Sequence, residues 1–342
     1  MNPSLRSFTP AQASAALGVS AKALRLYEQH GLLVPDRKRT GWRAYDASAM
    51  ARAADIVALR GLGLSLAQVA RVLDGSSRDL DAGLAAHEAR LSEQSQQTAA
   101  AIERVRSLRA DIAQGRIPGP ATLAKALAQN AALTIGFALP WPWDGEWFAL
   151  HDVPRLAFIT GPLGSGKTRF AQRLAAALPD AMFLGLDRLS DPAVSQRLAD
   201  NAAPAEQVER RLTWLVEDGA ERSDALTTLV VALEAAMPTA LVIDMVEEGL
   251  SAATQTALMA HLRLRGTSKR ALILMTRSSA ILDLEALEPT EVVVLCPANH
   301  SAPLHVVPYP GGQGYEAVAT CIASPEVRAR TAGIVAMRPH PS

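Results

Sequence analysis

One eight-residue motif constrains the fold of this chain more than any other feature. Residues 161–168 read GPLGSGKT, a full match to the pattern G-x-x-x-x-G-K-[ST]. The motif follows an apolar stretch, 156–160, and precedes an amphipathic segment, 169–178. In this strand–loop–helix context the loop amides can curl around phosphate oxygens at the start of the helix. The sequence therefore predicts a phosphate-binding loop within an α/β domain.

The residues around this loop predict a site for a nucleoside triphosphate and a metal ion. Lys167 is placed to reach the β- and γ-phosphates, and the Thr168 hydroxyl is placed to hold Mg²⁺. A second apolar stretch, 239–244, ends at Asp244, which we expect to supply a carboxylate to the same ion. The expected cofactors are therefore ATP and Mg²⁺. The expected nucleotide-binding residues are Gly161, Pro162, Leu163, Gly164, Ser165, Gly166, Lys167, Thr168 and Asp244, and the last two are the expected metal ligands.

Apolar stretches alternate with amphipathic helical patterns through the second half of the chain. The stretch 271–276 is strand-like, and so are 292–295 and 304–307. Strands that alternate with helices predict a parallel, doubly wound sheet, whose site lies at the carboxyl ends of the strands.

The first 75 residues differ from the rest of the chain in charge. They hold ten Lys and Arg against five Asp and Glu, although the whole chain is neutral with 34 of each class. Helical patterns at 10–17 and 21–30 are separated by a short turn at Gly18. Two short helices joined in this way predict a helix-turn-helix, whose second helix enters the DNA major groove. The positive charge suits contact with DNA phosphates.

A basic stretch, 35–45, follows the second helix and predicts a β-hairpin wing. Its arginines are expected to meet phosphate, while Trp42 and Tyr45 anchor the hairpin.

This part of the sequence resembles the MerR family of transcriptional regulators. The motifs that carry the resemblance are LRLYE at 24–28, GLL at 31–33, RAY at 43–45 and GLSLAQV at 63–69. The resemblance implies that promoter DNA and RNA polymerase are partners, and that Arg25, Tyr27, Arg43 and Tyr45 contact the DNA. The alternative is that the two tyrosines only pack the core. The expected DNA-binding residues are Ser20, Lys22, Arg25, Tyr27, Arg37, Lys38, Arg39, Arg43 and Tyr45.

A long polar helix is predicted over 80–115. Leu, Leu, Thr, Val and Ile stand at positions 84, 91, 98, 105 and 112, a seven-residue spacing that is typical of a coiled-coil seam. The MerR resemblance implies an antiparallel homodimer through this helix, and the alternative is a helix that packs on its own chain. The two cysteines, Cys296 and Cys321, lie far from it, so we expect no metal sensing there.

The order of the nucleotide-binding motifs resembles that of ABC-type ATPases. In that family a catalytic glutamate directly follows the metal-binding aspartate, and a later strand ends at a histidine. Met245 and Arg277 stand at these two positions here, which implies slow hydrolysis or none. Glu247 or Glu248 is the candidate catalytic residue, and the alternative is that both are exposed acids or caps.

Three tryptophans, at 141, 143 and 147, precede the phosphate-binding loop. The ABC resemblance implies that Trp143 or Trp147 stacks on adenine; the alternative is that both anchor a β-turn.

These patterns predict a multidomain chain. It comprises an all-α, winged helix-turn-helix DNA-binding domain over 1–76, a coiled-coil dimerisation helix over 77–115, a linker over 116–129 and an α/β P-loop nucleotide-binding domain over 130–342. No apolar run reaches the ~18 residues of a membrane span, so we expect a cytoplasmic protein without a membrane partner.

The expected function is that of a dimeric transcriptional regulator whose promoter binding or activation is modulated by ATP binding. One alternative is a DNA-tethered ATPase that remodels DNA or a partner protein by turnover. Another is a kinase that acts on a small molecule.

Overall fold

The structure, a computed structural model, describes residues 7–37, 43–116, 119, 134–151, 153–235, 237–264 and 270–330. The chain divides into two compact units. The N-terminal unit comprises Met1–Ala131, Thr213–Gly219 and Ala260–Thr267, and the C-terminal unit comprises Ala132–Leu212, Ala220–Met259 and Ser268–Ser342. Two segments from the second half of the chain therefore belong to the N-terminal unit. Most of the predicted linker lies outside the described residues.

The N-terminal unit contains a winged helix-turn-helix, as predicted. Its elements are α1 (Pro10–Leu17), α2 (Ala21–Gln29), β1 (Asp36–Arg37), β2 (Arg43–Ala44), α3 (Ala47–Gly61) and α4 (Leu66–Leu73). Each helix begins at a side chain that accepts a hydrogen bond from an amide of the first turn: Thr9, Ser20, Asp46 and Ser65. Gly18 ends α1 with a left-handed φ of 65°, which lets the chain turn into α2.

A small apolar core holds these helices together. Leu24 and Tyr27 of α2 pack with Ile56 of α3 and with Leu66 and Val69 of α4, and all five are buried. The two short strands form an antiparallel hairpin beside this core.

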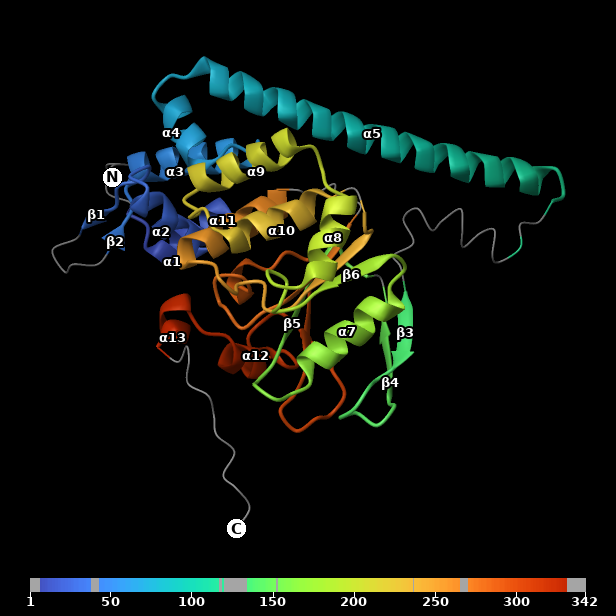
Figure 1. Ribbon diagram of the computed structural model, residues 1–342. Coiled ribbons are helices and arrows are strands. Elements are labelled where there is room, and N and C mark those ends of the chain that lie inside the picture. Colours follow the sequence, from blue (N-terminus) through green and yellow to red (C-terminus); the bar gives the residue numbers. More distant parts are fainter. Residues whose placement is uncertain are drawn as a thin grey trace, which may run out of the picture. The chain divides into compact units, whose positions relative to one another are not determined.

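A single long helix, α5 (Ser77–Ala113), follows and runs without interruption for 37 residues (Figure 1). Five of its apolar side chains are between 45% and 55% exposed: Leu84, Leu91, Ile102, Val105 and Ile112. The predicted long helix is confirmed, whereas its pairing with a second copy stays a prediction.

The C-terminal unit is built on a six-stranded sheet. Its strands are β5 (Leu156–Thr160), β6 (Ala181–Leu184), β7 (Ala240–Ile243), β8 (Ala271–Met275), β9 (Val292–Leu295) and β10 (Leu304–His305). Their order is β10-β9-β5-β8-β7-β6, and only β10 runs antiparallel to its neighbour. The predicted parallel sheet is therefore confirmed. The order places β8 between β5, which leads into the phosphate-binding loop, and β7, which leads into Asp244.

The helices of this half are α7 (Lys167–Ala177), α8 (Pro192–Asp200), α9 (Ala205–Glu217), α10 (Asp224–Glu234), α11 (Ala252–Leu264), the 3₁₀ helix η2 (Leu284–Ala286), α12 (Tyr315–Cys321) and α13 (Pro325–Ala329). Helices α9 and α11 each begin in the C-terminal unit and end in the N-terminal one. None of the helices within the described ranges combines the length and apolar character needed to cross a membrane.

A two-stranded hairpin of β3 (Ile135–Ala138) and β4 (Trp147–Leu150) adds aromatic packing to α7. Phe148 of β4 meets Phe170 of α7 edge to face, with the ring centroids 4.9 Å apart. The start of α7, which carries the residues after the loop, is thereby held from two sides, by the large sheet and by this hairpin.

Candidate functional site

The loop between β5 and α7 has a backbone form suited to bind phosphate. Gly164 and Gly166 have φ of 81° and 88°, a left-handed region that other residues rarely adopt. A Cβ at Gly161 would collide with the carbonyl oxygen of Cys296, and one at Gly166 would lie 2.7 Å from the ring of Trp143. Gly166 caps α7 without a side-chain hydrogen bond, so the helix N-terminus faces the loop uncovered by a capping side chain.

Lys167 is buried at the first position of α7. Its Nζ donates to the carbonyl oxygen of Pro162 at 2.6 Å and lies 3.5 Å from the Ser165 hydroxyl. Burial lowers the pKa of Lys167, and the charge of Arg277 lowers it further, whereas Asp244 opposes the shift. The ammonium therefore lies across the loop, where phosphate oxygens of a nucleotide would neutralise it.

Asp244 lies directly after β7 and beside Thr168. The Thr168 hydroxyl donates to Asp244 Oδ2 at 3.0 Å, while Asp244 Oδ1 is buried and has no hydrogen-bond partner among the described residues. Burial raises the pKa of Asp244, and Thr168 and Lys167 oppose that shift. A buried carboxylate with a free oxygen next to a hydroxyl is a donor set that Mg²⁺ accepts. These residues therefore fit the expected metal ion: Thr168 and Asp244 would hold it, and it would supply positive charge beside the phosphates of a nucleotide.

Arg188, in the turn after β6, holds the backbone behind Asp244. Its buried guanidinium donates to the carbonyl oxygens of Asp244 at 2.9 Å and of Met245 and Glu248 at 3.2 Å, and also to that of Gly185 at 3.1 Å. Met245 has a left-handed φ of 42°, a backbone conformation that residues other than glycine rarely adopt. Sequence reasoning missed Arg188, because it lies 56 residues from Asp244 in a loop without a motif.

The two candidate catalytic glutamates occupy different environments. Glu248 is exposed, whereas Glu247 is buried. Glu247 Oε1 accepts a hydrogen bond from the backbone amide of Arg277 at 2.9 Å and forms an ion pair with Arg328 of α13. Glu247 therefore ties the turn after β7 to the end of β8 and to α13, a contact that the sequence did not suggest. A catalytic role for either glutamate stays a prediction.

Two further residues support the phosphate-binding loop. Trp143 is buried and donates from Nε1 to the carbonyl oxygen of Ser301 at 2.9 Å, so it anchors the turn behind the loop. Trp147 is 71% exposed. His300 Nε2 lies 3.1 Å from the carbonyl oxygen of Gly164, which joins the loop after β9 to the phosphate-binding loop.

The start of α2 carries the polar residues expected to reach DNA. The Ser20 hydroxyl accepts from the Ala23 amide at 3.1 Å and so caps the helix. Lys22 is half-buried and Arg25 is exposed one turn further along. The helix therefore presents a positive charge outside the core, as a recognition helix requires.

The two tyrosines of the expected DNA-binding set are packed into the N-terminal core. Tyr27 and Tyr45 are both buried, and the Tyr45 hydroxyl donates to Glu28 at 2.6 Å. Burial raises the pKa of Tyr45, and the hydrogen bond to Glu28 raises it further. Both tyrosines therefore pack in the core of the N-terminal domain, and their contact with DNA stays a prediction.

The wing places one of its basic residues on the surface. Arg43 is exposed, and its Nε lies 3.4 Å from Glu28. Arg37 pairs with Arg43 across the hairpin backbone. Lys38 and Arg39 lie outside the described residues.

Comparison with known proteins agrees with this geometry at the N-terminus. The family model described as MerR HTH family regulatory protein matches residues 8–76. Residues 8–76 are a MerR helix-turn-helix domain. The MerR domain therefore comprises α1 to α4 with the wing between α2 and α3.

Similar proteins include the nodulation protein NolA of Bradyrhizobium diazoefficiens. It is 29% identical over 184 residues, which cover 52% of this chain and 76% of that protein. HiNmlR is a MerR family regulator lacking the sensor domain, solved bound to promoter DNA. It is 20% identical to this chain with a TM-score of 0.28, and the match covers 33% of this chain and 100% of HiNmlR. MJ1267, an ATP-binding cassette of an ABC transporter in its ADP conformation, is 14% identical and covers 59% of this chain and 99% of that one, with a TM-score of 0.36.

Proposed function

We propose that this chain is a promoter-binding transcriptional regulator whose binding or activation is modulated by ATP in its P-loop domain. The observation that carries the proposal is the Thr168–Asp244 pair, in which one buried carboxylate oxygen has no hydrogen-bond partner among the described residues. This pair lies beside the glycine-rich loop and the buried Lys167. That arrangement suits Mg²⁺–ATP, and it lies in one chain with a MerR domain. ATP would act as an effector if its affinity differs between the DNA-bound and free states.

Slow turnover, or none, is the second part of the proposal. Met245 follows Asp244 and has no group that can take a proton from water. Glu247 is engaged by Arg328 and by the Arg277 amide, which ties its carboxylate to structural partners. A slow ATPase can hold a bound nucleotide long enough to report its presence to the DNA-binding domain.

The proposed assembly is a homodimer through α5, because the apolar side chains of that helix are half exposed at coiled-coil spacing. Two MerR domains brought together in this way suit a palindromic promoter element. RNA polymerase is the further partner proposed for a regulator of this kind.

A DNA-tethered ATPase is the second candidate function. The intact set of Lys167, Thr168 and Asp244 is compatible with it, because the residues that would bind Mg²⁺–ATP are also those that hold the metal and phosphates in P-loop ATPases.

One experiment separates the two functions. A duplex selected by the protein from a random pool is titrated without nucleotide, with Mg²⁺–ATP, and with a non-hydrolysable ATP analogue, while phosphate release is followed. An affinity change with the analogue supports the effector role. A change that requires phosphate release supports the tethered ATPase. Equal affinity in all three conditions would contradict the effector role, and the absence of phosphate release would contradict the tethered ATPase.

A further inference from the structure

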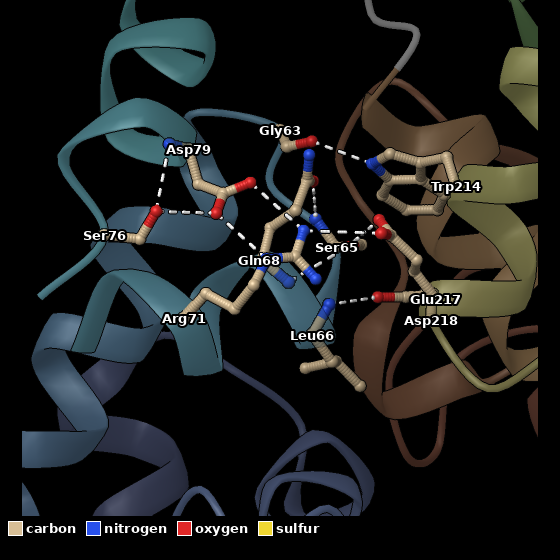
Figure 2. Close-up of polar contacts among 10 residues, drawn as sticks. All are labelled: Gly63, Ser65, Leu66, Gln68, Arg71, Ser76, Asp79, Trp214, Glu217 and Asp218. Carbon is tan, nitrogen blue, oxygen red and sulfur yellow. Dashed lines mark hydrogen bonds and ion pairs between the residues drawn. The ribbon is translucent and has the colours of Figure 1, made fainter. Parts of the chain in front are cut away.

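A short acidic segment at the end of α9 packs within the N-terminal unit. Residues 213–219 belong to that unit, and their side chains meet the corner where α3 ends and α4 begins (Figure 2). Asp218 is at the centre of the contact. Its side chain is fully buried, with 0% of its surface exposed.

Three hydrogen bonds hold the Asp218 carboxylate. Arg60 donates from Nη1 to Oδ1 at 2.5 Å and from Nη2 to Oδ2 at 3.0 Å, a two-pronged ion pair. The backbone amide of Leu66 donates to Oδ1 at 2.8 Å. Burial raises the pKa of Asp218, while Arg60 and the Leu66 amide oppose that shift.

The Leu66 amide has a special place in α4. It is the first residue of the helix, and the first amides of a helix have no partner within it. The Ser65 cap satisfies the amide of Gln68 instead, so Asp218 supplies a second cap from 152 residues away along the chain. The carboxylate also lies at the positive end of the helix dipole.

Neighbouring side chains extend the contact on both sides of Asp218. The Ser65 hydroxyl donates to Glu217 at 2.9 Å, and Arg71 Nη2 donates to Glu217 at 3.3 Å (Figure 2). Trp214 Nε1 donates to the carbonyl oxygen of Gly63 at 3.0 Å. The ring of Trp214 also lies under the Arg60 guanidinium, 5.4 Å from centroid to Cζ.

The contact reaches the recognition helix as well. His30 ends α2, and its ring lies against Gly219. Arg60, which holds Asp218, also donates to the carbonyl oxygen of Leu64 and so fixes the connection between α3 and α4. Residues 214–219 thus touch the ends of α2 and α3 and the start of α4, which together set how the recognition helix is presented.

We propose that the α3–α4 corner is a docking site for residues 213–219, and that this contact couples the nucleotide site to DNA binding. The proposal rests on the function proposed above, since it names the contact through which ATP acts. Helix α9 begins at Ala205 in the C-terminal unit and ends at Glu217 in the N-terminal one. A displacement of the end of α9 would cost the three hydrogen bonds of Asp218, because its carboxylate is buried and has no water to replace them.

The test measures coupling as the ratio of the dissociation constants of the selected duplex without and with the non-hydrolysable ATP analogue. In the wild type we expect a ratio of roughly 5–150-fold, and the same factor for the effect of the duplex on nucleotide affinity, because coupling is reciprocal. Asp218→Asn keeps the shape and removes the charge that pairs with Arg60. We expect its ratio to fall to about one, with nucleotide affinity in the absence of DNA unchanged.

Two companions make the result specific. Glu217→Gln, at the edge of the contact, should lower the coupling ratio to a value between one and that of the wild type. If Asp218→Asn fails to fold, Glu217→Gln is the variant that tests the proposal. Glu209→Gln removes an exposed carboxylate from the same helix, where it pairs with Arg222, and should leave the ratio unchanged. A wild-type ratio of one would overturn the proposed function and the coupling together. A wild-type ratio above one that both contact variants retain would overturn the docking proposal alone.

Discussion

At the scale of single residues, the proposed nucleotide site depends on the surroundings of one carboxylate, that of Asp244. Asp244 is buried, which disfavours its charged form, yet Thr168 and Lys167 hold that charge in place. Arg188 fixes the same residue from behind through its backbone carbonyl. The result is a buried carboxylate oxygen that has no hydrogen-bond partner among the described residues and is available to a metal ion.

Asp244→Asn should therefore remove the dependence of ATP binding on Mg²⁺. The amide keeps the size of the side chain and cannot support a divalent cation as a carboxylate does. Calorimetry with Mg²⁺ and with EDTA should show at least a tenfold difference in dissociation constant for the wild type, about 1.4 kcal/mol, and almost none for the variant. Asp187→Asn, at an exposed position after β6, is the control and should behave as wild type. Unchanged magnesium dependence in Asp244→Asn would remove Asp244 from the metal site.

At the scale of helices, α5 is joined to the MerR domain by an ion pair at its first turn. Arg71 of α4 binds Asp79 of α5 with two hydrogen bonds, at 2.9 and 3.0 Å, and the Ser76 hydroxyl donates to the same carboxylate. These contacts lower the pKa of Asp79 to about 2, with the Arg71 hydrogen bond as the largest cause. The carboxylate also lies near the positive end of the α5 dipole.

The pH dependence of this junction follows from the lowered pKa of Asp79. The stabilisation is present above the ordinary pKa of 3.8 and is lost as the pH falls towards about 2. The reason is that Asp79 takes up a proton at a lower pH in the folded protein than in the unfolded chain. Asp79→Asn should lower the melting temperature at pH 6 by an amount equivalent to at most about 1 kcal/mol, since the pair is solvent-exposed. Thermal melts from pH 6 to pH 2 should show the difference in melting temperature between wild type and Asp79→Asn shrinking below pH 4. Asp81→Asn is the control, and its melting temperature should differ less from that of the wild type. A difference that is constant with pH would rule out the charge as its cause.

The exposed stripe of α5 makes a second prediction at this scale. Leu91→Asp combined with Val105→Asp should convert a dimer into monomers that bind the selected duplex poorly, because charges cannot be buried unpaired in a coiled-coil seam. Ser92→Asp with Ser107→Asp adds the same charge at exposed positions off the stripe and should leave the dimer intact. Sedimentation at micromolar concentration measures both. A monomeric wild type would contradict the assembly.

At the scale of the whole molecule, the proposed DNA-binding and nucleotide-binding functions rest on separate folds in one chain. The MerR domain has its own core and helix caps, and the phosphate-binding loop has its own sheet. The two activities should therefore be lost independently.

Arg25→Ala should weaken binding of the selected duplex by roughly 1–3 kcal/mol and leave ATP binding unchanged. Lys167→Ala should do the reverse: it should abolish Mg²⁺–ATP binding, while binding of the duplex in the absence of nucleotide stays at the wild-type level. Fluorescence anisotropy with labelled duplex and calorimetry with ATP measure the two affinities on the same preparations. Loss of both activities in either single variant would show that the units do not function separately.

Local patterns in the sequence determined the local structures. GPLGSGKT between an apolar stretch and an amphipathic one specified strand, loop and helix, because glycine conformation and side-chain periodicity act over neighbouring residues. The same holds for Asp244 at the end of an apolar strand and for the capped helices of the MerR domain. Their bounds moved by only a few residues; α7, for example, begins at Lys167 because the left-handed Gly166 ends the loop.

Tertiary packing alone decided which distant residues meet. The sequence could not place β8 between β5 and β7, since strand order depends on how helices cross the sheet. Nor could it pair Arg188 with the Asp244 backbone, Arg328 with Glu247, or Asp218 with Arg60, because a buried charge finds its partner through the shape of the folded chain rather than through spacing. Asp218 illustrates the limit most clearly: along the sequence it is one acid at the end of a polar helix, and only the fold makes it a cap for a helix of the DNA-binding domain.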